Sequence, residues 1–382
     1  MMSDQNQKIR ILFVGEIISS HAQSWMRLLD REPQSFDIQC FTVPRAPYPK
    51  NSPFKNIFDK FRKIDSPKIP ALVHSKMLEF IIMTYKPHII HTFAAFPTVA
   101  FYMPVFKKYR HRFKWVSQVR GGSDVYINRF DPVKNDILRD LFKECDVLIA
   151  DNEINYNIAS ELGIDPSKKW HYGIAPGTGG VDLLEFSAAL SPSKSQKRVI
   201  WPKAYEGFES KGLPVLEAIK IAWPKIKGTQ FIFTAGNAEL NGHLRFLPKE
   251  ISDHIDVRDR IARPEMLKLM QQSRVVMAPS LLEGIPNTLY ESMAAQCVPI
   301  YSPLETYQDK FIDNKNILYA RNLFPQEIAE ALVTALNDDV LADKIAAENI
   351  SYIDKIANRK NIADNLVTLY KNLGRVQKNA NN

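Results

Sequence analysis

Two glutamates, Glu283 and Glu291, are separated by seven residues. Glu283 lies in a Gly/Pro turn that follows the apolar run 275–278, and Glu291 lies about one turn inside a predicted helix. A strand, a tight turn and a helix start are typical of an anion site, because amide groups and the helix dipole point at the ligand. An ionised Glu only accepts hydrogen bonds, so this site predicts a ligand with both phosphate and hydroxyls, such as a nucleotide sugar.

The turn between the two glutamates is predicted to bind through its backbone, since a glycine allows close approach of amide groups. Leu289 and Met293 share one face of the helix and are predicted to pack on the sheet, whereas Glu291 lies roughly 200° around the axis from Leu289. Alternatively, both glutamates are ordinary loop and surface carboxylates. The residues that we expect to bind the donor here are Gly284, Ile285, Pro286 and Asn287, with Asn287 as the helix N-cap.

Two lysines flank a second loop, which follows the predicted strand 199–201. Lys203 lies at the end of this strand, and Lys211 directly precedes the predicted helix 213–222. Two cations at these positions could neutralise a pyrophosphate and stabilise it as a leaving group. The alternative is that both lysines are solvated loop residues.

A third group of polar residues follows predicted strands of the N-terminal half. Arg120, Gly121 and Asp124 follow one strand, and a glycine pair before an acid allows close backbone approach and a hydrogen bond from a sugar hydroxyl. His91 and Gly15 also lie at predicted strand ends. A turn without chemistry is the alternative interpretation of this group.

Short apolar runs alternate with helical patterns along the whole chain, which predicts parallel sheets covered by helices on both faces. Ligands of such doubly wound sheets bind outside the carboxyl ends of the strands, where the candidate residues lie. The predicted strands are 9–14, 38–43, 88–91, 115–119, 147–150, 199–201, 230–234, 255–257, 274–278 and 298–301.

The strands form two series, and the polar segment 183–197 between them has the composition of a connector. We predict an N-terminal domain over 1–185, a C-terminal domain over 186–358, and a helix within 359–382 that crosses back to the N-terminal domain. The expected fold is α/β, with two doubly wound, Rossmann-like parallel-sheet domains that face each other across a cleft.

The composition is ordinary for a globular protein, with 45% apolar and 24% charged residues in 382. The three cysteines are far apart, which argues against a disulfide framework or a zinc cluster. The first residues lack the pattern of a signal peptide, so we expect a cytoplasmic protein. The net charge of +8 fits either a solvated surface or attraction to an anionic membrane face or substrate. No nucleic-acid module is recognisable, so a nucleic-acid partner is not expected.

The chain resembles the retaining glycosyltransferases of family 4, which have the two-domain GT-B fold. Glu283 and Glu291 match the E-x7-E motif of that family, and the following run 292–299 is similar to its "EAMA-G-PV" segment. Lys211 and Gly212 match its "KG" pair. Further similar segments are the strand and glycine at Phe231 to Gly236, the "HG-D" element at Arg120 to Asp124, and the "GVD" crossing at Val181 and Asp182.

Some positions depart from the family pattern. Lys203 is the best match to the usual Arg before the Lys-Gly pair, and Lys lacks the bidentate fork of Arg. Gln296 replaces the usual Gly, and Arg120 stands where His is common. Only Gly15 remains of the glycine-rich loop after the first strand.

The resemblance implies transfer of a sugar from a nucleoside-diphosphate sugar to an acceptor hydroxyl with retention. Lys203 and Lys211 would meet the pyrophosphate, Glu291 the ribose and Glu283 the transferred sugar, with Gly236 near the base. Asp124, Arg120, Gly121, Gly15 and His91 would serve the acceptor. No Asp-x-Asp triplet occurs, so neither metal nor cofactor is expected beyond the nucleotide sugar.

The expected acceptor is a glycan or a lipid-linked glycan of surface polysaccharide or glycolipid assembly, reached from the cytoplasm or from the inner face of the membrane by peripheral contact. Other functions remain open on the same two-domain plan. They are a nucleotide-sugar epimerase or hydrolase, a non-catalytic two-domain ligand-binding protein, and a catalytically silent relative that keeps the nucleotide pocket.

Overall fold

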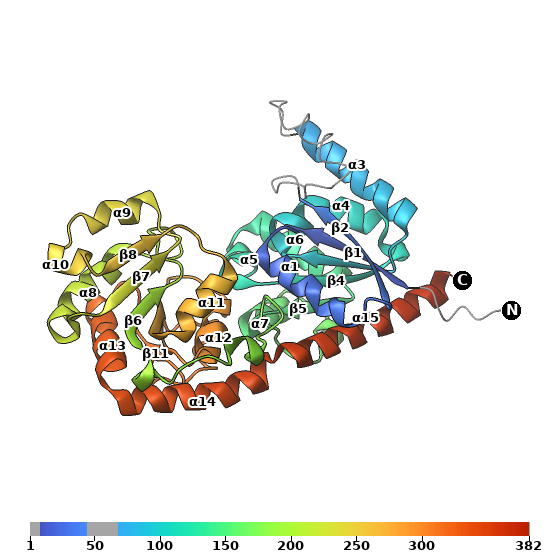
Figure 1. Ribbon diagram of the computed structural model, residues 1–382. Helices are drawn as coiled ribbons and strands as arrows, with labels where there is room; N and C mark the ends of the chain where they lie inside the picture. Colours follow the sequence, from blue (N-terminus) through green and yellow to red (C-terminus); the bar gives the residue numbers. More distant parts are fainter. Residues whose placement is uncertain (1–7, 44–67, 382) are drawn as a thin grey trace. The chain divides into compact units, whose positions relative to one another are not determined.

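The computed structural model describes residues 8–43 and 68–381 (Figure 1). The chain divides into two compact units. Unit 1 comprises Met1–Gly179 and Arg359–Asn382, and unit 2 comprises Gly180–Asn358. The division lies between Gly179 and Gly180, whereas we predicted it after residue 185. The segment that begins at Arg359 belongs to unit 1 and not to the unit that precedes it in the sequence.

Unit 1 contains a five-stranded parallel sheet with the strand order β2-β1-β3-β4-β5. Four of its strands are almost entirely buried, as parallel strands covered on both faces require, whereas the middle of the edge strand β2 is exposed. The strands are β1 (Ile9–Gly15), β2 (Phe36–Thr42), β3 (Ile89–Phe93), β4 (Lys114–Val119) and β5 (Val147–Ala150).

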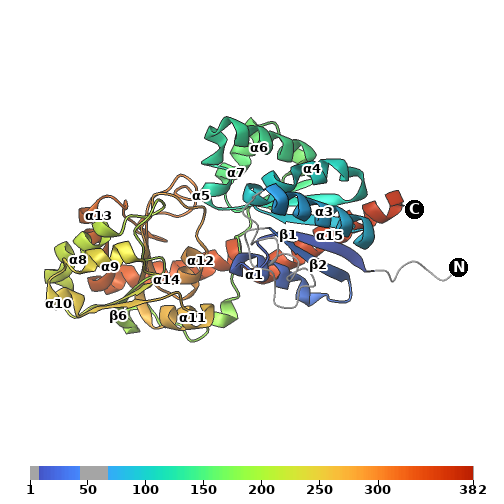
Figure 2. The ribbon, with the colours of Figure 1, turned by 90° about the horizontal axis from the view of Figure 1, so that it is seen from above.

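Helices cover both faces of this sheet (Figures 1 and 2). Local caps start several of them, for example Asp131, which accepts hydrogen bonds from the amides of Val133 and Lys134. The helices are α1 (Ser20–Met26), α3 (Lys68–Tyr85), α4 (Ala100–Lys108), α5 (Gly121–Asp124), α6 (Pro132–Glu144), α7 (Glu153–Glu161) and α15 (Arg359–Asn381). Short helical turns are η2 (Arg27–Arg31), η3 (Ala95–Val99), η4 (Arg110–Arg112), η5 (Asn128–Phe130) and η6 (Pro166–Lys168).

Helix α15 packs on the unit 1 sheet through one apolar face. Ile362, Leu366 and Tyr370 join the buried cluster that contains Phe13 of β1 and Trp25 of α1. The opposite face of the sheet carries a second cluster, to which α3, α4 and α6 contribute. The C-terminal segment therefore completes the core of unit 1.

Unit 2 contains a six-stranded parallel sheet with the order β11-β10-β9-β6-β7-β8. This is the dinucleotide-binding order, in which the chain moves outward from the middle in both directions. The strands are β6 (Gln196–Trp201), β7 (Gln230–Thr234), β8 (Ile255–Arg258), β9 (Ser273–Ala278), β10 (Val298–Tyr301) and β11 (Leu318–Tyr319). The ten predicted strands are all present, and the two-residue strand β11 was missed.

The unit 2 helices bury apolar faces on this sheet, and Leu289 and Met293 are fully buried as predicted. The helices are α8 (Gly212–Ile226), α9 (Ala238–Leu244), α10 (Lys249–Ser252), α11 (Arg263–Gln271), α12 (Asn287–Ala294), α13 (Pro325–Asn337) and α14 (Asp339–Ala357). Short turns are η7 (Leu183–Phe186) and η8 (Pro192–Lys194). The predicted α/β fold with two doubly wound parallel-sheet domains is confirmed. The predicted cleft concerns the relation between the units and stays a prediction.

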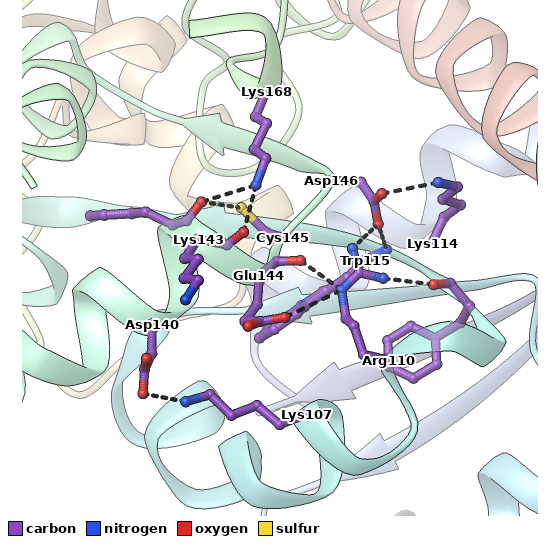
Figure 3. A network of polar contacts seen from close by, with 12 residues as sticks. Lys107, Arg110, Lys114, Trp115, Asp140, Lys143, Glu144, Cys145, Asp146 and Lys168 are labelled. Carbon is purple, nitrogen blue, oxygen red and sulfur yellow. Dashed lines mark hydrogen bonds and ion pairs between the residues drawn. The ribbon is translucent and has the colours of Figure 1, made fainter. Parts of the chain in front are cut away.

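Several basic residues between positions 107 and 114 form ion pairs within unit 1 (Figure 3). Asp146 accepts from Arg110 Nη2 at 2.6 Å, from Lys114 Nζ at 3.1 Å and from the Trp115 amide at 2.7 Å. Lys107 pairs with Asp140 at 2.6 Å. The Asp146 contacts join η4 and β4 to the start of β5, and the Lys107–Asp140 pair joins α4 to α6. None of the described helices combines the length and the apolar character needed to span a bilayer.

Candidate functional site

The unit 2 sheet has its topological switch point between β6 and β9, where the chain turns outward in opposite directions. Ligands of doubly wound sheets bind at this point, outside the carboxyl ends of the strands. Lys203 follows β6 and Glu283 follows β9, and the Lys203 ammonium forms an ion pair with Oε1 of Glu283. The fold thus brings together two residues that the sequence analysis assigned to one site.

Hydrogen bonds hold the two loops of this edge together. Asn322, which is buried, donates to the carbonyls of Lys211 and Pro279 at 3.0 Å each, and its Oδ1 accepts from the Lys211 amide at 3.0 Å. The Ser210 hydroxyl also donates to the Pro279 carbonyl at 3.0 Å. The loop that contains Lys203 and Lys211 and the loop that contains Glu283 are therefore joined by hydrogen bonds. Asn322 lies far away in the sequence, and no local pattern predicts its role.

Lys211 is the N-cap residue of α8, and its Nζ lies 3.2 Å from Oε1 of Glu206. Oε2 of Glu206 accepts from the amides of Gly212 at 2.8 Å and Leu213 at 3.3 Å. Burial favours the neutral acid, but the hydrogen bonds from Lys211 and these two amides lower the pKa of Glu206. A protein carboxylate thus occupies the helix N-terminus and shares the Lys211 charge, which the sequence analysis did not foresee.

Glu291 lies on α12 and is less accessible than predicted, with 13% of its side chain exposed. Arg263 Nε donates to Oε1 of Glu291 at 2.9 Å, and both terminal nitrogens of Arg263 donate to Glu185 at 2.9 Å. Burial raises the pKa of Glu291, while the Arg263 cation opposes the shift. Arg263 therefore favours the charged form of a largely buried carboxylate and holds it in position.

The charges of Glu283 and Glu291 both affect one tyrosine at the carboxyl edge of the unit 2 sheet. Tyr301 ends β10, and its hydroxyl donates to the Thr288 hydroxyl at 3.2 Å. Burial raises the pKa of Tyr301, and the charges of Glu283 and Glu291 add to this shift. Both carboxylates therefore lie within electrostatic reach of the same buried tyrosine.

The turn between the glutamates is packed into unit 2. Gly284, Ile285 and Pro286 are buried, so this turn presents no exposed side chain to a ligand, and backbone contacts with the donor stay a prediction. Asn287 is the first residue of α12, and the N-cap is Pro286, which provides no side-chain acceptor. The prediction of Asn287 as N-cap was therefore wrong by one position.

Gly236 lies between β7 and α9, next to the loop that contains Lys203 and Lys211. A Cβ built there would approach Cγ1 of Val257 to 3.0 Å and the Ala204 carbonyl oxygen to 3.6 Å. The Ala204 amide donates to the Thr234 carbonyl at 3.0 Å. The glycine thus belongs to the same carboxyl edge as Lys203.

In unit 1 four of the predicted acceptor residues lie at the carboxyl ends of strands, namely Gly15, Arg120, Gly121 and Asp124. Asp124 is buried, and its two oxygens accept from the amides of Ala95 at 3.1 Å, Phe96 at 3.0 Å and Arg120 at 3.2 Å. Burial raises the pKa of Asp124 to about 6. With its oxygens engaged by the backbone, Asp124 holds the loops after β3 and β4 together, and its contact with an acceptor hydroxyl stays a prediction.

Gly15, at the end of β1, has φ 153°, and a Cβ there would lie 2.9 Å from Cβ of Phe93. Only glycine therefore fits where the ends of β1 and β3 meet. Its contribution to an acceptor would come from the backbone.

The acceptor contact predicted for His91 was wrong. Strand β3 continues to Phe93, so His91 is an interior strand residue and not a strand end. Its side chain is fully buried against Phe13 and Phe93, and Nδ1 lies 2.6 Å from the Tyr370 hydroxyl of α15. Burial lowers the pKa of His91 to about 3. His91 is a neutral core residue.

No group of three or more His, Cys, Asp or Glu side chains is arranged to hold a metal ion in the described residues. The candidate site of unit 2 consists of cations, carboxylates and backbone groups. Such a set can bind an anion with hydroxyls by charge and hydrogen bonding.

Residues 199–338 match the family model described as glycosyl transferases group 1. The match begins at β6 and spans Lys203, Lys211, Glu283 and Glu291, so it covers the whole candidate site of unit 2. It supports glycosyltransferase activity, in agreement with the resemblance derived from the motifs. No sequence among the curated proteins matches the chain significantly.

Solved structures extend the likeness in fold to nearly the full chain. Sucrose-phosphate synthase from Thermosynechococcus elongatus is 14% identical, over 97% of this chain and 100% of that chain, with a TM-score of 0.71. HepE of Anabaena, solved with UDP-glucose, is 12% identical over 95% and 100%, with a TM-score of 0.70. A glycosyltransferase from Rickettsia africae is 13% identical over 96% and 99%, with a TM-score of 0.68. At such identities the likeness shows the shared GT-B fold.

Proposed function

We propose that the protein transfers a sugar from a nucleoside-diphosphate sugar to an acceptor hydroxyl, with retention and without a metal. The observation that carries this proposal is the Lys203–Glu283 pair at the switch point of unit 2. A cation and a carboxylate held together there suit a ligand that combines phosphate with sugar hydroxyls. The group 1 family match over the same residues supports it.

In the proposed complex the diphosphate approaches Lys203 and Lys211 and exchanges with their carboxylate partners. Each lysine then leaves its glutamate partner and forms an ion pair with a phosphate oxygen. The freed carboxylate can accept hydrogen bonds from sugar hydroxyls. The developing charge on the leaving diphosphate would be stabilised by cations already in place. Glu291, fixed by Arg263, would accept from the ribose hydroxyls.

Residues at the carboxyl edge of unit 1 would recognise the acceptor. We propose a glycan or lipid-linked glycan of surface polysaccharide or glycolipid assembly. The protein would act in the cytoplasm, with peripheral contact to the inner face of the membrane, and the net charge of +8 favours attraction to an anionic surface.

The test begins with thermal-shift screening against nucleoside diphosphates and nucleotide sugars, because a ligand of the native state raises Tm. A radiolabelled sugar from the best donor is then followed onto a panel of glycan and lipid-linked acceptors, with and without EDTA. Transfer that depends on acceptor and on Glu283, with retained anomeric configuration by NMR, supports the proposal. Donor turnover that is equal without acceptor indicates a hydrolase or epimerase instead, and binding without turnover indicates a ligand-binding protein.

A further inference from the structure

The guanidinium of Arg120 forms no ion pair or hydrogen bond with a carboxylate in the described part of unit 1, although the charges of Asp124, Asp151 and Glu16 act on it. Arg120 directly follows β4 and precedes α5 at the carboxyl edge of the sheet. Its Nη1 is buried, and no described residue provides it with a hydrogen-bond partner. The ring of Phe93 lies beside the guanidinium, with its centroid 6.0 Å from Cζ. A buried guanidinium nitrogen without a hydrogen-bond partner is costly for the protein.

The carboxylates near Arg120 are committed to other donors. Asp124 accepts from three backbone amides, as described above. Asp151 follows β5 and accepts from the Gly121 amide at 2.7 Å and from the side-chain amides of Asn152 at 2.7 Å and Asn155 at 3.2 Å. Both acids therefore shape the loops around Arg120, and neither forms a hydrogen bond with its guanidinium in the described structure.

Glu16 is the remaining acid whose charge acts on Arg120. It is exposed after β1, and the two side chains make no ion pair in the part of the chain that the structure describes. An exposed carboxylate retains its hydration, so it does not compensate the buried nitrogen of Arg120.

The residue that follows Arg120 leaves open space beside the backbone. Gly121 has φ +72°, and a Cβ built on it would meet no described heavy atom within 4 Å. The backbone here is therefore open on the side where a side chain would stand, directly after Arg120 in the chain.

We infer that the acceptor carries an anionic group, a carboxylate or a phosphate, and that Arg120 binds this group. The inference rests on the proposed function and names its acceptor class. A planar guanidinium donates to two oxygens of such a group at once, which a histidine at this position cannot do. Arg120 thereby becomes a residue that determines acceptor specificity.

The test compares a neutral sugar with its anionic counterparts. Methyl glucoside, methyl glucuronide and glucose 6-phosphate are titrated against the full chain by ligand-detected NMR, with and without a nucleoside diphosphate from the screen. The last two probes distinguish a carboxylate from a phosphate. Arg120→Gln is expected to weaken binding of the preferred anionic probe about tenfold, because one charged hydrogen-bonding partner is lost. Binding of methyl glucoside should be unchanged. Arg120→Lys should restore part of the affinity.

Arg139→Gln is the matched control. Arg139 is exposed on α6 and donates to Asn135, so this variant removes the same charge away from the proposed site. Equal losses in Arg120→Gln and Arg139→Gln, or a wild type that binds neither anionic probe more tightly than the neutral one, overturn the inference. If Arg120→Gln does not fold, as judged by circular dichroism and thermal unfolding, Arg120→Lys decides, since Lys lacks the bidentate fork of Arg. Weaker binding of the anionic probe with unchanged binding of methyl glucoside supports the inference, and binding of both probes as in the wild type overturns it.

Failure of this inference differs from failure of the proposed function. If the wild type transfers sugar with equal efficiency to neutral and anionic acceptors, only the anion preference is wrong. If no nucleotide sugar binds or turns over, the transferase proposal is wrong, whatever Arg120 binds.

Discussion

Lys203 and Glu283 form an ion pair although eighty positions separate them in the sequence. Each follows one of the two strands, β6 and β9, between which the topology of unit 2 reverses. The pair therefore marks the point where a doubly wound sheet binds its ligand. Since 42% of the lysine side chain and 18% of the glutamate side chain are exposed, water screens the attraction and the pair can open.

Removing the cation of this pair tests whether it serves the reaction or the fold. Lys203→Gln is expected to lower kcat/KM for the donor by about tenfold or more, through loss of one charged contact with the diphosphate. The free energy of unfolding should fall by less than about 1 kcal/mol, because the pair is partly exposed. Steady-state kinetics and urea denaturation measure the two effects. A large loss of stability with unchanged kinetics would assign Lys203 to the fold alone.

Lys211 is expected to act mainly in the transition state. Lys211→Ala should lower kcat by on the order of a hundredfold, as removal of other preorganised charge stabilisers does. The control is Lys220→Ala, because Lys220 lies on the same helix and pairs with Glu217 at its surface. Wild-type kinetics in Lys211→Ala would remove this residue from the mechanism.

Glu291 is expected to govern nucleotide affinity. Glu291→Ala should weaken binding of the nucleoside diphosphate by about 1–3 kcal/mol, because hydroxyl donors lose a charged acceptor. Calorimetric titration gives the dissociation constant directly. An unchanged value would refute the ribose contact.

Arg263 should make nucleotide binding less sensitive to acid. Burial raises the pKa of Glu291 and the Arg263 cation counteracts this rise, so Arg263→Gln raises the pKa further. If ionised Glu291 accepts from the ribose, affinity falls as the pH drops through this pKa. The fall should begin at higher pH in Arg263→Gln than in the wild type, and identical pH profiles of the dissociation constant would contradict the coupling.

Glu206 should stabilise unit 2 in a pH-dependent manner. Its folded-state pKa is lowered, so its contribution is present above the ordinary value of 4.5 and is lost as the pH falls through the lower folded-state pKa. Glu206→Gln is expected to cost about 1 kcal/mol at neutral pH through the weakened helix cap. The difference from wild type in urea denaturation should shrink toward pH 3. A difference independent of pH would show that charge is not involved.

Gly15 should be intolerant of any side chain. Gly15→Ala is expected to destabilise unit 1 by about 3 kcal/mol, since the new Cβ meets Phe93 in a strained backbone conformation. Gly163→Ala provides the control, because Gly163 has φ +89° but open space around a Cβ. It should cost only about 1 kcal/mol of backbone strain. Equal losses in the two variants would show that the contact with Phe93 is unimportant.

The sequence by itself determined the strands and the unit 2 motif. Runs such as 230–234 and 298–301 are so rich in β-branched and aromatic residues that their local pattern and their tertiary environment agree. The Glu283 to Glu291 spacing and the loop from Lys203 to Lys211 were recognisable because turn, cap and charge residues lie within a few positions of one another.

Only the tertiary structure decided which side chains are exposed and which partners they have. The sequence shows His91 near a strand end, but the register of β3 and the packing of α15 bury it beneath Tyr370. It likewise shows Glu206 and Arg263 as ordinary charged residues, whereas the fold places each against a site residue. Burial and partner choice depend on contacts between distant segments, and a single chain pattern does not encode those contacts locally.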